Sequence, residues 1–289
     1  MTDEPSPAAP ESLETRLARL EAQEQALRQF IVPAYWNLLD RVYAPAPPSA
    51  EAECLACGRR SDLTDFALRT DECVFGGGVL QRLECGACGC VFGPLKYLTL
   101  PEPLIAADYR LLYAHYQEGD STEAELRAFE LLEPRRDGLY LNWGSGGWSR
   151  SVQILRERGF DVWGFEPNAA SDSPFVVRSR GEVSARFDGV FSNNVIEHFL
   201  SPALQFRDFL NVLTPTGRMA HASPCYRWSY AFTRFHVFFP LGRAPEALAE
   251  RTGFRVASRT DDGEFQAVVY ERQAAASSER PGLTPGHGG

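Results

Sequence analysis

The stretch "GLYLNWGSGGWSR" at residues 138–150 decides the fold of this 289-residue chain. It is an apolar run that ends in glycines, as in a buried strand followed by a turn whose backbone can approach a ligand closely. Gly144 and Gly146 would let the chain leave the strand sharply, and Trp148 stands where a third glycine is usual, at the start of the next helix. The stretch therefore predicts a nucleoside- or phosphate-binding turn in which Trp148 could wall or partly fill the site.

A carboxylate follows at the expected distance. Glu166 lies 22 residues after Gly144, at the end of the next apolar run "VWGFEPN", where it can accept the hydroxyl hydrogens of a ribose. Strand-like and helix-like segments then alternate, which predicts a parallel sheet covered by helices, closed by an antiparallel hairpin around "DDGE". The expected strands are 138–143, 160–167, 186–193, 217–224, 254–260 and 264–272, and the expected helices between them are 149–159 and 201–213.

Two later blocks give the sequence a family resemblance. "FDGVFSNNVIEHF" at 187–199 and "VLTPTGRMAHASP" at 212–224, after the glycine turn and the acid, resemble the class I S-adenosylmethionine-dependent methyltransferases over roughly residues 109–272. The resemblance implies an α/β fold, a Rossmann-like and mostly parallel sheet with a terminal antiparallel strand, and S-adenosylmethionine as cofactor. The cofactor-binding residues that it implies are Asn142, Gly144, Ser145, Gly146, Glu166, Asn193 and Asn194.

The chain departs from the family pattern at two places. Asn142 stands where the family usually has an aspartate, so it can offer the cofactor's ammonium only a neutral carbonyl oxygen. Between Glu166 and Asp188 the chain is short, so the helix and strand usual there should be abbreviated.

The segment "CYRWSYAFTRFHVFFPLGR" at 225–243 offers acceptor-activating groups. His236 is the first choice as a base, because an unperturbed histidine titrates near neutrality; the alternative is a histidine packed among neighbouring phenylalanines. His198 matches a family position beside the substrate pocket but could equally serve helix packing, and Glu197 reads as a surface or helix-stabilising acid. The candidate catalytic residues are His236, Tyr226, Tyr230 and His198, with His221 a weaker candidate.

Four cysteines form two C-x2-C knuckles, Cys54 with Cys57 and Cys85 with Cys88. Four thiolates held by two tight turns match the tetrahedral shell of a structural Zn2+ ion, and a hairpin turning at "GGG" (76–78) could join the knuckles. Redox or merely buried thiols are the alternative, and Cys73 or Cys90 could replace a ligand. Some methyltransferases of sugar and natural-product pathways carry a similar N-terminal zinc-binding module.

The rest of the chain divides by composition. Leu13, Leu17, Leu20, Leu27, Ile31 and Leu38 follow a four-three spacing, interrupted by Glu24 and Ala34, that predicts an amphipathic or coiled-coil helix and a possible homodimer. Packing of this helix on its own chain is the alternative. The predicted segments are 1–11 disordered, 12–43 helix, 44–52 linker, 53–100 zinc-ribbon module, 101–137 helical lid, 138–272 methyltransferase domain and 273–289 disordered tail.

The net charge and the hydropathy of the sequence indicate which binding partners and which cellular compartment to expect. The net charge of −9 and pI near 5.2 argue against nucleic acid or an anionic membrane as the main partner. No apolar run approaches the roughly 20 residues of a membrane span, and the N-terminus does not resemble a signal peptide. We therefore expect a cytoplasmic protein with reduced cysteines.

These patterns and the family resemblance together predict methyl transfer from S-adenosylmethionine to a small-molecule acceptor. The resemblance alone implies the acceptor class, such as a sugar, a nucleotide-sugar or a glycan precursor. Trp148, Asn142 and the short middle segment favour an alternative, a catalytically degenerate protein of the same fold that serves assembly or binding. A nicotinamide oxidoreductase would keep the glycine turn but leave the cysteine knuckles and the final hairpin unexplained.

Overall fold

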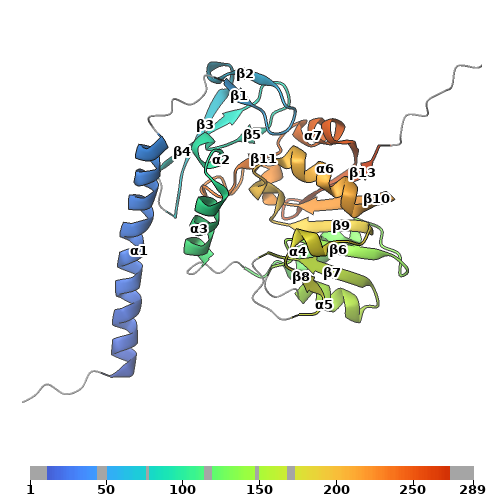
Figure 1. The fold of residues 1–289 in the computed structure, drawn as a ribbon, viewed down its shortest axis with the longest axis horizontal. Coiled ribbons are helices and arrows are strands. Elements are labelled where there is room, and N and C mark those ends of the chain that lie inside the picture. The colour runs from blue at the N-terminus through green and yellow to red at the C-terminus, as the bar shows by residue number, and fades with distance from the viewer. Residues whose placement is uncertain are drawn as a thin grey trace, which may run out of the picture.

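The computed structural model describes residues 12–43, 51–75, 78–113, 119–146, 150–167 and 173–273. Within these ranges the chain forms a long N-terminal helix, a small cysteine-containing β unit and an α/β unit (Figure 1). Trp148, the 76–77 part of the predicted "GGG" turn and both predicted disordered ends lie outside the described residues. None of the helices in the described ranges is long and apolar enough to cross a membrane.

The α/β unit is built on a mixed sheet that has seven strands within the described residues. Its order is β12-β13-β10-β9-β6-β7-β8, in which β10, β9, β6, β7 and β8 are mutually parallel and β13 runs antiparallel to both β10 and β12. This confirms the predicted fold class, including the reversed strand of the closing hairpin. The strands are β6 (Leu139–Trp143), β7 (Asp161–Phe165), β8 (Val176–Val177), β9 (Phe187–Asn193), β10 (Leu213–Ala222), β12 (Phe254–Asp261) and β13 (Gln266–Arg272).

Helices cover both faces of this sheet because successive strand side chains point to opposite sides. On β6, Tyr140 packs with Phe129 and Val152 of one helical layer, whereas Leu141 belongs to the core that contains Phe209 of the other layer. The first layer is α4 (Thr122–Glu130) and α5 (Arg150–Glu157), and the second is α6 (Pro202–Val212) and α7 (Ala244–Thr252). The two-residue strand β8 confirms that the middle segment is short.

The small β unit contains the cysteine knuckles and a second sheet of order β11-β5-β4-β3. Its edge strand β11 comes from the far end of the sequence, and Phe238 and Phe239 pair antiparallel with Phe92 and Val91. The acceptor segment predicted at 225–243 is thus joined to the N-terminal unit by main-chain hydrogen bonds. The strands are β1 (Glu51–Glu53), which begins inside the predicted linker, β2 (Arg60–Asp62), β3 (Ala67–Glu72), β4 (Val79–Glu84), β5 (Val91–Phe92) and β11 (Phe238–Phe239).

A buried arginine reinforces this joint. Arg82 on β4 is fully buried and donates hydrogen bonds to the carbonyl oxygens of Ala231 (2.8 Å), Thr233 (2.7 Å), His236 (3.1 Å) and Gly93 (3.2 Å). Since a buried guanidinium must satisfy its donors, the 231–236 backbone is held in one conformation against the β unit.

The helix α1 (Leu13–Tyr43) runs through Pro33 as a single helix. In Figure 1 it stands apart from the α/β unit, and its C-terminal half lies nearest α2 (Leu95–Leu98) and α3 (Glu102–Tyr113). Trp36 anchors it: the indole is buried, lies 5.9 Å from the ring of Tyr97 and stacks under the ammonium of Lys96. One side of α1 therefore packs on its own chain near this residue.

Candidate active site

The predicted cofactor residues gather where parallel strands end. β6, β7 and β9 are adjacent, so their carboxyl ends lie at one edge of the sheet, the usual ligand edge of such folds. After β6 the chain turns back on β7: the N–H groups of Gly144 and Ser145 both donate to the carbonyl of Phe165, at 2.8 and 3.2 Å. This brings the glycine turn beside Glu166, the next residue of the neighbouring strand end.

The two glycines of this turn are needed for different reasons. Both have positive φ, +75° at Gly144 and +67° at Gly146. A Cβ on Gly144 would lie 2.5 Å from Cγ2 of Val195, so this glycine is required by a contact within the protein. A Cβ on Gly146 would meet no described atom within 4 Å, so the open side of the turn is at Gly146, where a ligand has room.

Glu166 closes the other side of that opening. It is half-buried, and its Oε2 accepts a hydrogen bond from the Gly146 N–H at 3.3 Å. The carboxylate is therefore held against the main chain of the glycine turn, at the predicted ribose position.

Asn142 is used differently from the sequence expectation. Its amide nitrogen donates to the carboxylate of Glu125 at 2.6 Å, and the hydroxyl of Ser151, the second residue of α5, donates to the same oxygen. Its Oδ1 is buried without a hydrogen-bond partner among the described residues. Burial raises the pKa of the Glu125 carboxyl. Glu125, supplied by α4, thus brings an acid beneath the glycine turn that sequence reasoning missed.

Asn193 and Asn194 follow β9, as predicted. Asn193 is half-buried at the strand end and Asn194 is exposed. Asn194 takes the left-handed conformation (φ +55°), which asparagine tolerates better than most residues, and its N–H donates to the Ala222 carbonyl at 3.1 Å. Both lie at the same sheet edge as Gly144, and their role toward a cofactor stays a prediction.

Two of the candidate catalytic residues come together. The imidazoles of His198 and His236 lie with ring centroids 4.9 Å apart in an edge-to-face arrangement, although 38 positions separate them in sequence. His198 Nδ1 lies 2.6 Å from the Tyr109 hydroxyl and 3.0 Å from the Phe235 carbonyl. Tyr109, from α3, is a member of the site that the sequence did not reveal.

Both histidines are held neutral. Burial lowers the pKa of His198 to about 4, and burial, followed by the nearby His198 and Arg82, lowers the pKa of His236 to about 3. The Nδ1 of His236 lies 2.9 Å from the Tyr230 carbonyl. A carbonyl can only accept, so Nδ1 of each histidine carries the hydrogen and Nε2 carries the lone pair.

The other candidates lie outside this pair. Tyr230 is half-exposed and contributes its main-chain carbonyl. The Tyr226 hydroxyl lies 3.4 Å from that of Tyr270, and burial raises its pKa well above the ordinary value. His221 is fully buried among aromatic rings, with its Nδ1 2.8 Å from the Ser192 hydroxyl. The geometry therefore favours His198 and His236 as the groups that meet an acceptor.

A cavity of about 680 Å3 lies between the end of β7 and the histidine cluster. It extends from Pro167, directly after Glu166, to His198 and Tyr109, and its wall mixes apolar and polar side chains. The remaining lining residues are Glu102, Phe199, Leu200, Ser201, Leu204, Gln205 and Asp208.

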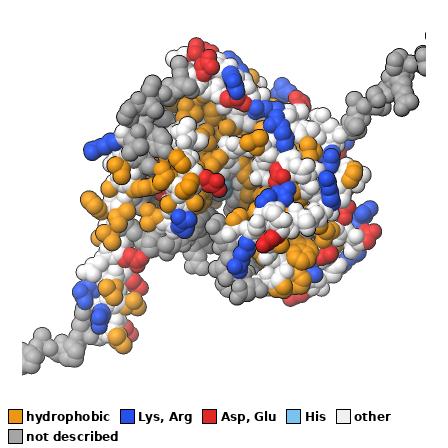
Figure 2. Space-filling model, in the orientation of Figure 1, with side chains coloured by type: hydrophobic (Ala, Val, Ile, Leu, Met, Phe, Trp, Pro, Cys, Tyr) orange, Lys and Arg blue, Asp and Glu red, His pale blue; other side chains and the backbone are white. Residues whose placement is uncertain are grey.

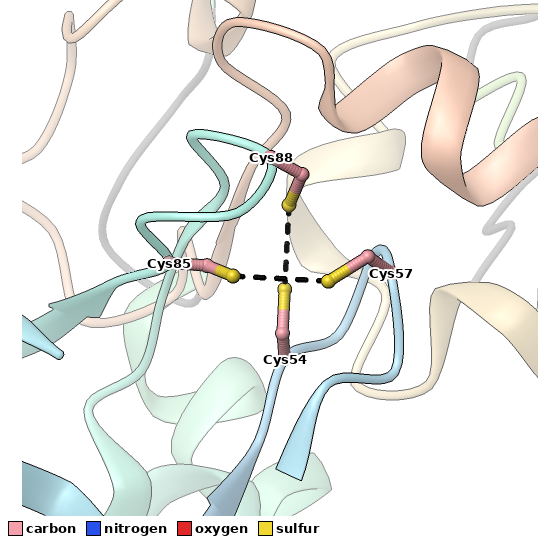
Figure 3. A group of neighbouring side chains, drawn as sticks. All are labelled: Cys54, Cys57, Cys85 and Cys88. Carbon is pink, nitrogen blue, oxygen red and sulfur yellow. Dashed lines mark hydrogen bonds between the residues drawn. The ribbon is translucent and has the colours of Figure 1, made fainter. Parts of the chain in front are cut away.

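The cysteine knuckles form a separate cluster (Figure 3). The sulfurs of Cys54 and Cys88 are 3.6 Å apart and those of Cys57 and Cys85 are 3.7 Å apart, and all four sulfurs lie within 4.8 Å of one another. A tetrahedral Zn2+ ion with bonds of about 2.3 Å needs sulfurs about 3.8 Å apart. The geometry therefore fits the predicted ligand set.

Cys73 and Cys90 are not members of this cluster. All seven cysteines fall in the described ranges and all are free thiols.

Comparison with known proteins gives a family but no near relative. A family model described as a methyltransferase domain matches residues 113–259, just over half of the chain. A search of curated proteins finds no match.

Solved structures with a similar fold share little sequence with the chain. A 1,6-didemethyltoxoflavin-N1-methyltransferase from Burkholderia thailandensis is 16% identical (68% of this chain, 96% of that chain, TM-score 0.45). An S-adenosylmethionine-dependent methyltransferase from Mesorhizobium loti is 17% identical (52% and 98%, TM-score 0.38). The glycopeptide N-methyltransferase MtfA is 16% identical (58% and 98%, TM-score 0.39). At such identities and TM-scores these structures assign no substrate to the chain.

Proposed function

Because the chain belongs to the methyltransferase domain family and is a methyltransferase, we propose that it transfers the methyl group of S-adenosylmethionine to a protic small molecule held in the cavity beside His198. One observation supports the proposal: a single cavity is lined by Pro167, the residue after Glu166, and by Tyr109 and His198, whose ring lies beside that of His236. Donor and acceptor positions are thus adjacent, as an in-line displacement requires.

The sheet edge fits the donor. Glu166 would accept the ribose hydroxyl hydrogens, and the open space beside Gly146 would take the amino-acid end. Bound S-adenosylmethionine would supply an electrophilic methyl group carried on a positively charged sulfur. When the methyl group bonds to the acceptor, its bond to sulfur breaks and the sulfur becomes a neutral thioether. Glu125 accepts hydrogen bonds from Asn142, before the glycine turn, and from Ser151, after it. These bonds hold the two ends of the turn together without a ligand.

The histidine pair fits the acceptor. Nε2 of a neutral imidazole can take the acceptor's proton as the methyl group arrives. The low pKa of His236 makes it a weak base in isolation, but a nitrogen of its ring lies within 4.8 Å of a Glu197 carboxylate oxygen, and a negative charge there favours the imidazolium. The Tyr109 hydroxyl and the Phe235 carbonyl fix the orientation of the His198 ring.

We propose a sugar, a nucleotide-sugar or another glycan precursor as acceptor. The resemblance to sugar and natural-product methyltransferases supports this class, and so does the cavity wall, where Ser201, Gln205 and Glu102 can bond hydroxyl groups beside the apolar Phe199 and Leu204.

Calorimetric titration with S-adenosylhomocysteine tests the donor site. We expect micromolar binding, weakened at least about tenfold in Glu166→Ala because charge-assisted hydrogen bonds are worth about 1.5–3 kcal/mol each. Glu157→Ala, an exposed acid on α5, should bind like the parent. Absence of binding by folded protein would refute the proposal.

A panel of sugars and nucleotide-sugars, with formation of S-adenosylhomocysteine as readout, tests the acceptor class. If S-adenosylhomocysteine binds but no compound of the panel increases the rate at which it is formed, the proposed acceptor class is wrong and the proposed donor site is retained.

We propose that Cys54, Cys57, Cys85 and Cys88 bind a structural Zn2+ ion within the predicted 53–100 module. The spacing of the sulfurs supports it, and the free state of all seven cysteines agrees with a reducing, cytoplasmic location. Metal analysis should find zinc in the parent protein and about one equivalent less in Cys54→Ser; parent protein without zinc would exclude the module.

We propose that α1 forms a parallel coiled coil with a second copy of the chain. Its heptad positions are exposed, from 39% at Ile31 to 84% at Leu13, and Figure 2 shows hydrophobic side chains among charged ones along its projecting end. The buried Trp36 lies on the opposite helix side, so packing on the chain leaves the seam open. In a parallel pair Arg16 of one copy would lie opposite Glu21 of the other.

Light scattering should give twice the 32.2 kDa chain mass for the parent and for Ala26→Glu. It should give the monomer mass for Leu27→Glu, which places the same charge on the seam. A monomeric parent at micromolar concentration would contradict the coiled coil.

A further inference from the structure

Three side chains with metal-binding atoms meet on the acceptor side of the cavity. Glu197, His198 and His236 each offer one ligand atom, and these atoms lie within 4.8 Å of one another. Glu197 is fully buried and the two histidines are half-buried. Glu197 and His198 are neighbours in a 3-10 turn (Ile196–His198) that follows β9, whereas His236 comes from the segment that leads into β11.

The histidines are oriented as metal ligands usually are. A metal-bound histidine generally donates its second ring N–H to a carbonyl or carboxylate, which fixes the tautomer and the ring plane. Here Nδ1 of His198 lies 3.0 Å from the Phe235 carbonyl and Nδ1 of His236 lies 2.9 Å from the Tyr230 carbonyl. Each ring therefore keeps the lone pair on Nε2.

Main-chain hydrogen bonds hold Glu197, His198 and His236 close to one another. The N–H of Val237 donates to the carbonyl of Glu197 at 2.9 Å, which ties the turn that carries two of the groups to the segment that carries the third. Arg82 fixes the same segment by its bond to the His236 carbonyl. The three groups are thus adjacent because of main-chain contacts rather than surface side-chain rotamers.

The donor set indicates the kind of cation. One carboxylate oxygen and two imidazole nitrogens suit borderline divalent ions such as Zn2+, Mn2+ or Fe2+ better than Mg2+ or Ca2+. A bound Zn2+ ion would draw the ligand atoms to about 3.4 Å from one another, since its bonds are about 2.1 Å. The nearby charge of Arg82 opposes a cation, but its guanidinium is directed at four carbonyl groups, and the Glu197 carboxylate offsets it.

We propose that Glu197, His198 and His236 bind a divalent cation of the Zn2+ or Mn2+ class that is separate from the cysteine cluster. Three protein ligands leave coordination positions open, as in catalytic metal sites, and His198 lines the acceptor cavity. Resting on the proposed methyl transfer, the cation would take the place of the imidazole base: it would hold an acceptor oxygen and lower its pKa, so that the proton leaves to water and the deprotonated oxygen takes the methyl group.

Cobalt titration of metal-stripped full-length protein tests the site. We expect two equivalents of Co2+ in the parent, only one of which gives the thiolate charge-transfer absorption of the cysteine cluster. Glu197→Gln and His236→Ala should each lose the equivalent without thiolate absorption, or bind it at least tenfold more weakly. His287→Ala, a change in the predicted tail, should keep both equivalents.

Two results would overturn the site: a single equivalent in the parent, or a second equivalent that survives in both Glu197→Gln and His236→Ala. Titration of the same variants with S-adenosylhomocysteine separates this outcome from failure of the proposed function, because donor binding does not involve these three residues. Retained binding also shows that the variants fold, and Glu197→Gln, which keeps the side-chain shape, serves if His236→Ala does not.

Discussion

Removal of the Asp108 carboxylate should destabilise the protein strongly. Asp108 on α3 forms two hydrogen bonds to the guanidinium of Arg234, at 2.6 and 2.7 Å, and both side chains are almost completely buried (0% and 2% exposed). Arg234 also lies over the rings of Trp36 and Phe235, at 5.2 and 4.5 Å. The pair therefore joins α1, α3 and the segment that carries His236.

In Asp108→Ala the guanidinium stays buried without its carboxylate, which typically costs about 3–5 kcal/mol. This corresponds to a fall of about two to four orders of magnitude in the folding equilibrium constant. The cost is a large part of a normal stability of about 5–15 kcal/mol. Urea unfolding followed by tryptophan fluorescence measures it. Asp161→Ala, which removes the more exposed Arg156–Asp161 pair (2.7 Å, Asp161 56% exposed), should cost about 1 kcal/mol or less.

A double variant completes the test. Asp108→Leu with Arg234→Met removes both charges, and apolar replacements of buried ion pairs are often neutral. We therefore expect the double variant to be more stable than Asp108→Ala. If Asp108→Ala costs no more than Asp161→Ala, the pair is hydrated and does not hold these elements together.

Two further predictions concern the glycine turn and the acid beneath it. In urea unfolding Gly146→Ala should cost about 1–2 kcal/mol, the strain of a left-handed residue, whereas Gly144→Ala should cost more and be partly rescued by Val195→Ala; equal costs would contradict the contact with Val195. Because the pKa of Glu125 is raised by burial, its contribution to stability is complete below the ordinary value of about 4.3 and is lost as pH rises through the raised pKa. The free energy of unfolding of the parent minus that of Glu125→Gln should therefore fall with rising pH, and a flat difference would refute the shift.

Local patterns were sufficient for the α/β unit. Hydrophobic runs bounded by turn residues predicted the strands, and the spacing from Gly144 to Glu166 predicted which strand ends would be neighbours. The knuckle spacing likewise predicted the four cysteines that cluster, because each C-x2-C pair is held by its own turn. Close approach of the backbone to a ligand is an incomplete reason for Gly144, since Val195 already fills the position that its side chain would take.

Contacts between distant segments could not be predicted in the same way. Glu125 and Tyr109 carry no motif, and Glu197, which stands in the block "FDGVFSNNVIEHF", was interpreted as a surface or helix-stabilising acid although it is fully buried. Their roles depend on α3, α4 and the turn after β9 packing at one edge of the sheet. Asn142, which favoured a degenerate protein, is bonded to Glu125, so the amide by itself is no sign of lost activity.

Because β11 pairs with β5, the small β unit is encoded by two separate parts of the gene. A gene fragment for the 138–272 domain would encode β11 without the strand that it completes, and a fragment for the 53–100 module would lack its edge strand. If recombination exchanged the cysteine module between relatives, the hybrid protein would keep the complete sheet only if the 225–243 segment were exchanged at the same time. Substitutions that alter this pairing should therefore appear together in two regions of the gene, those of β5 and β11, which lie more than 140 codons apart.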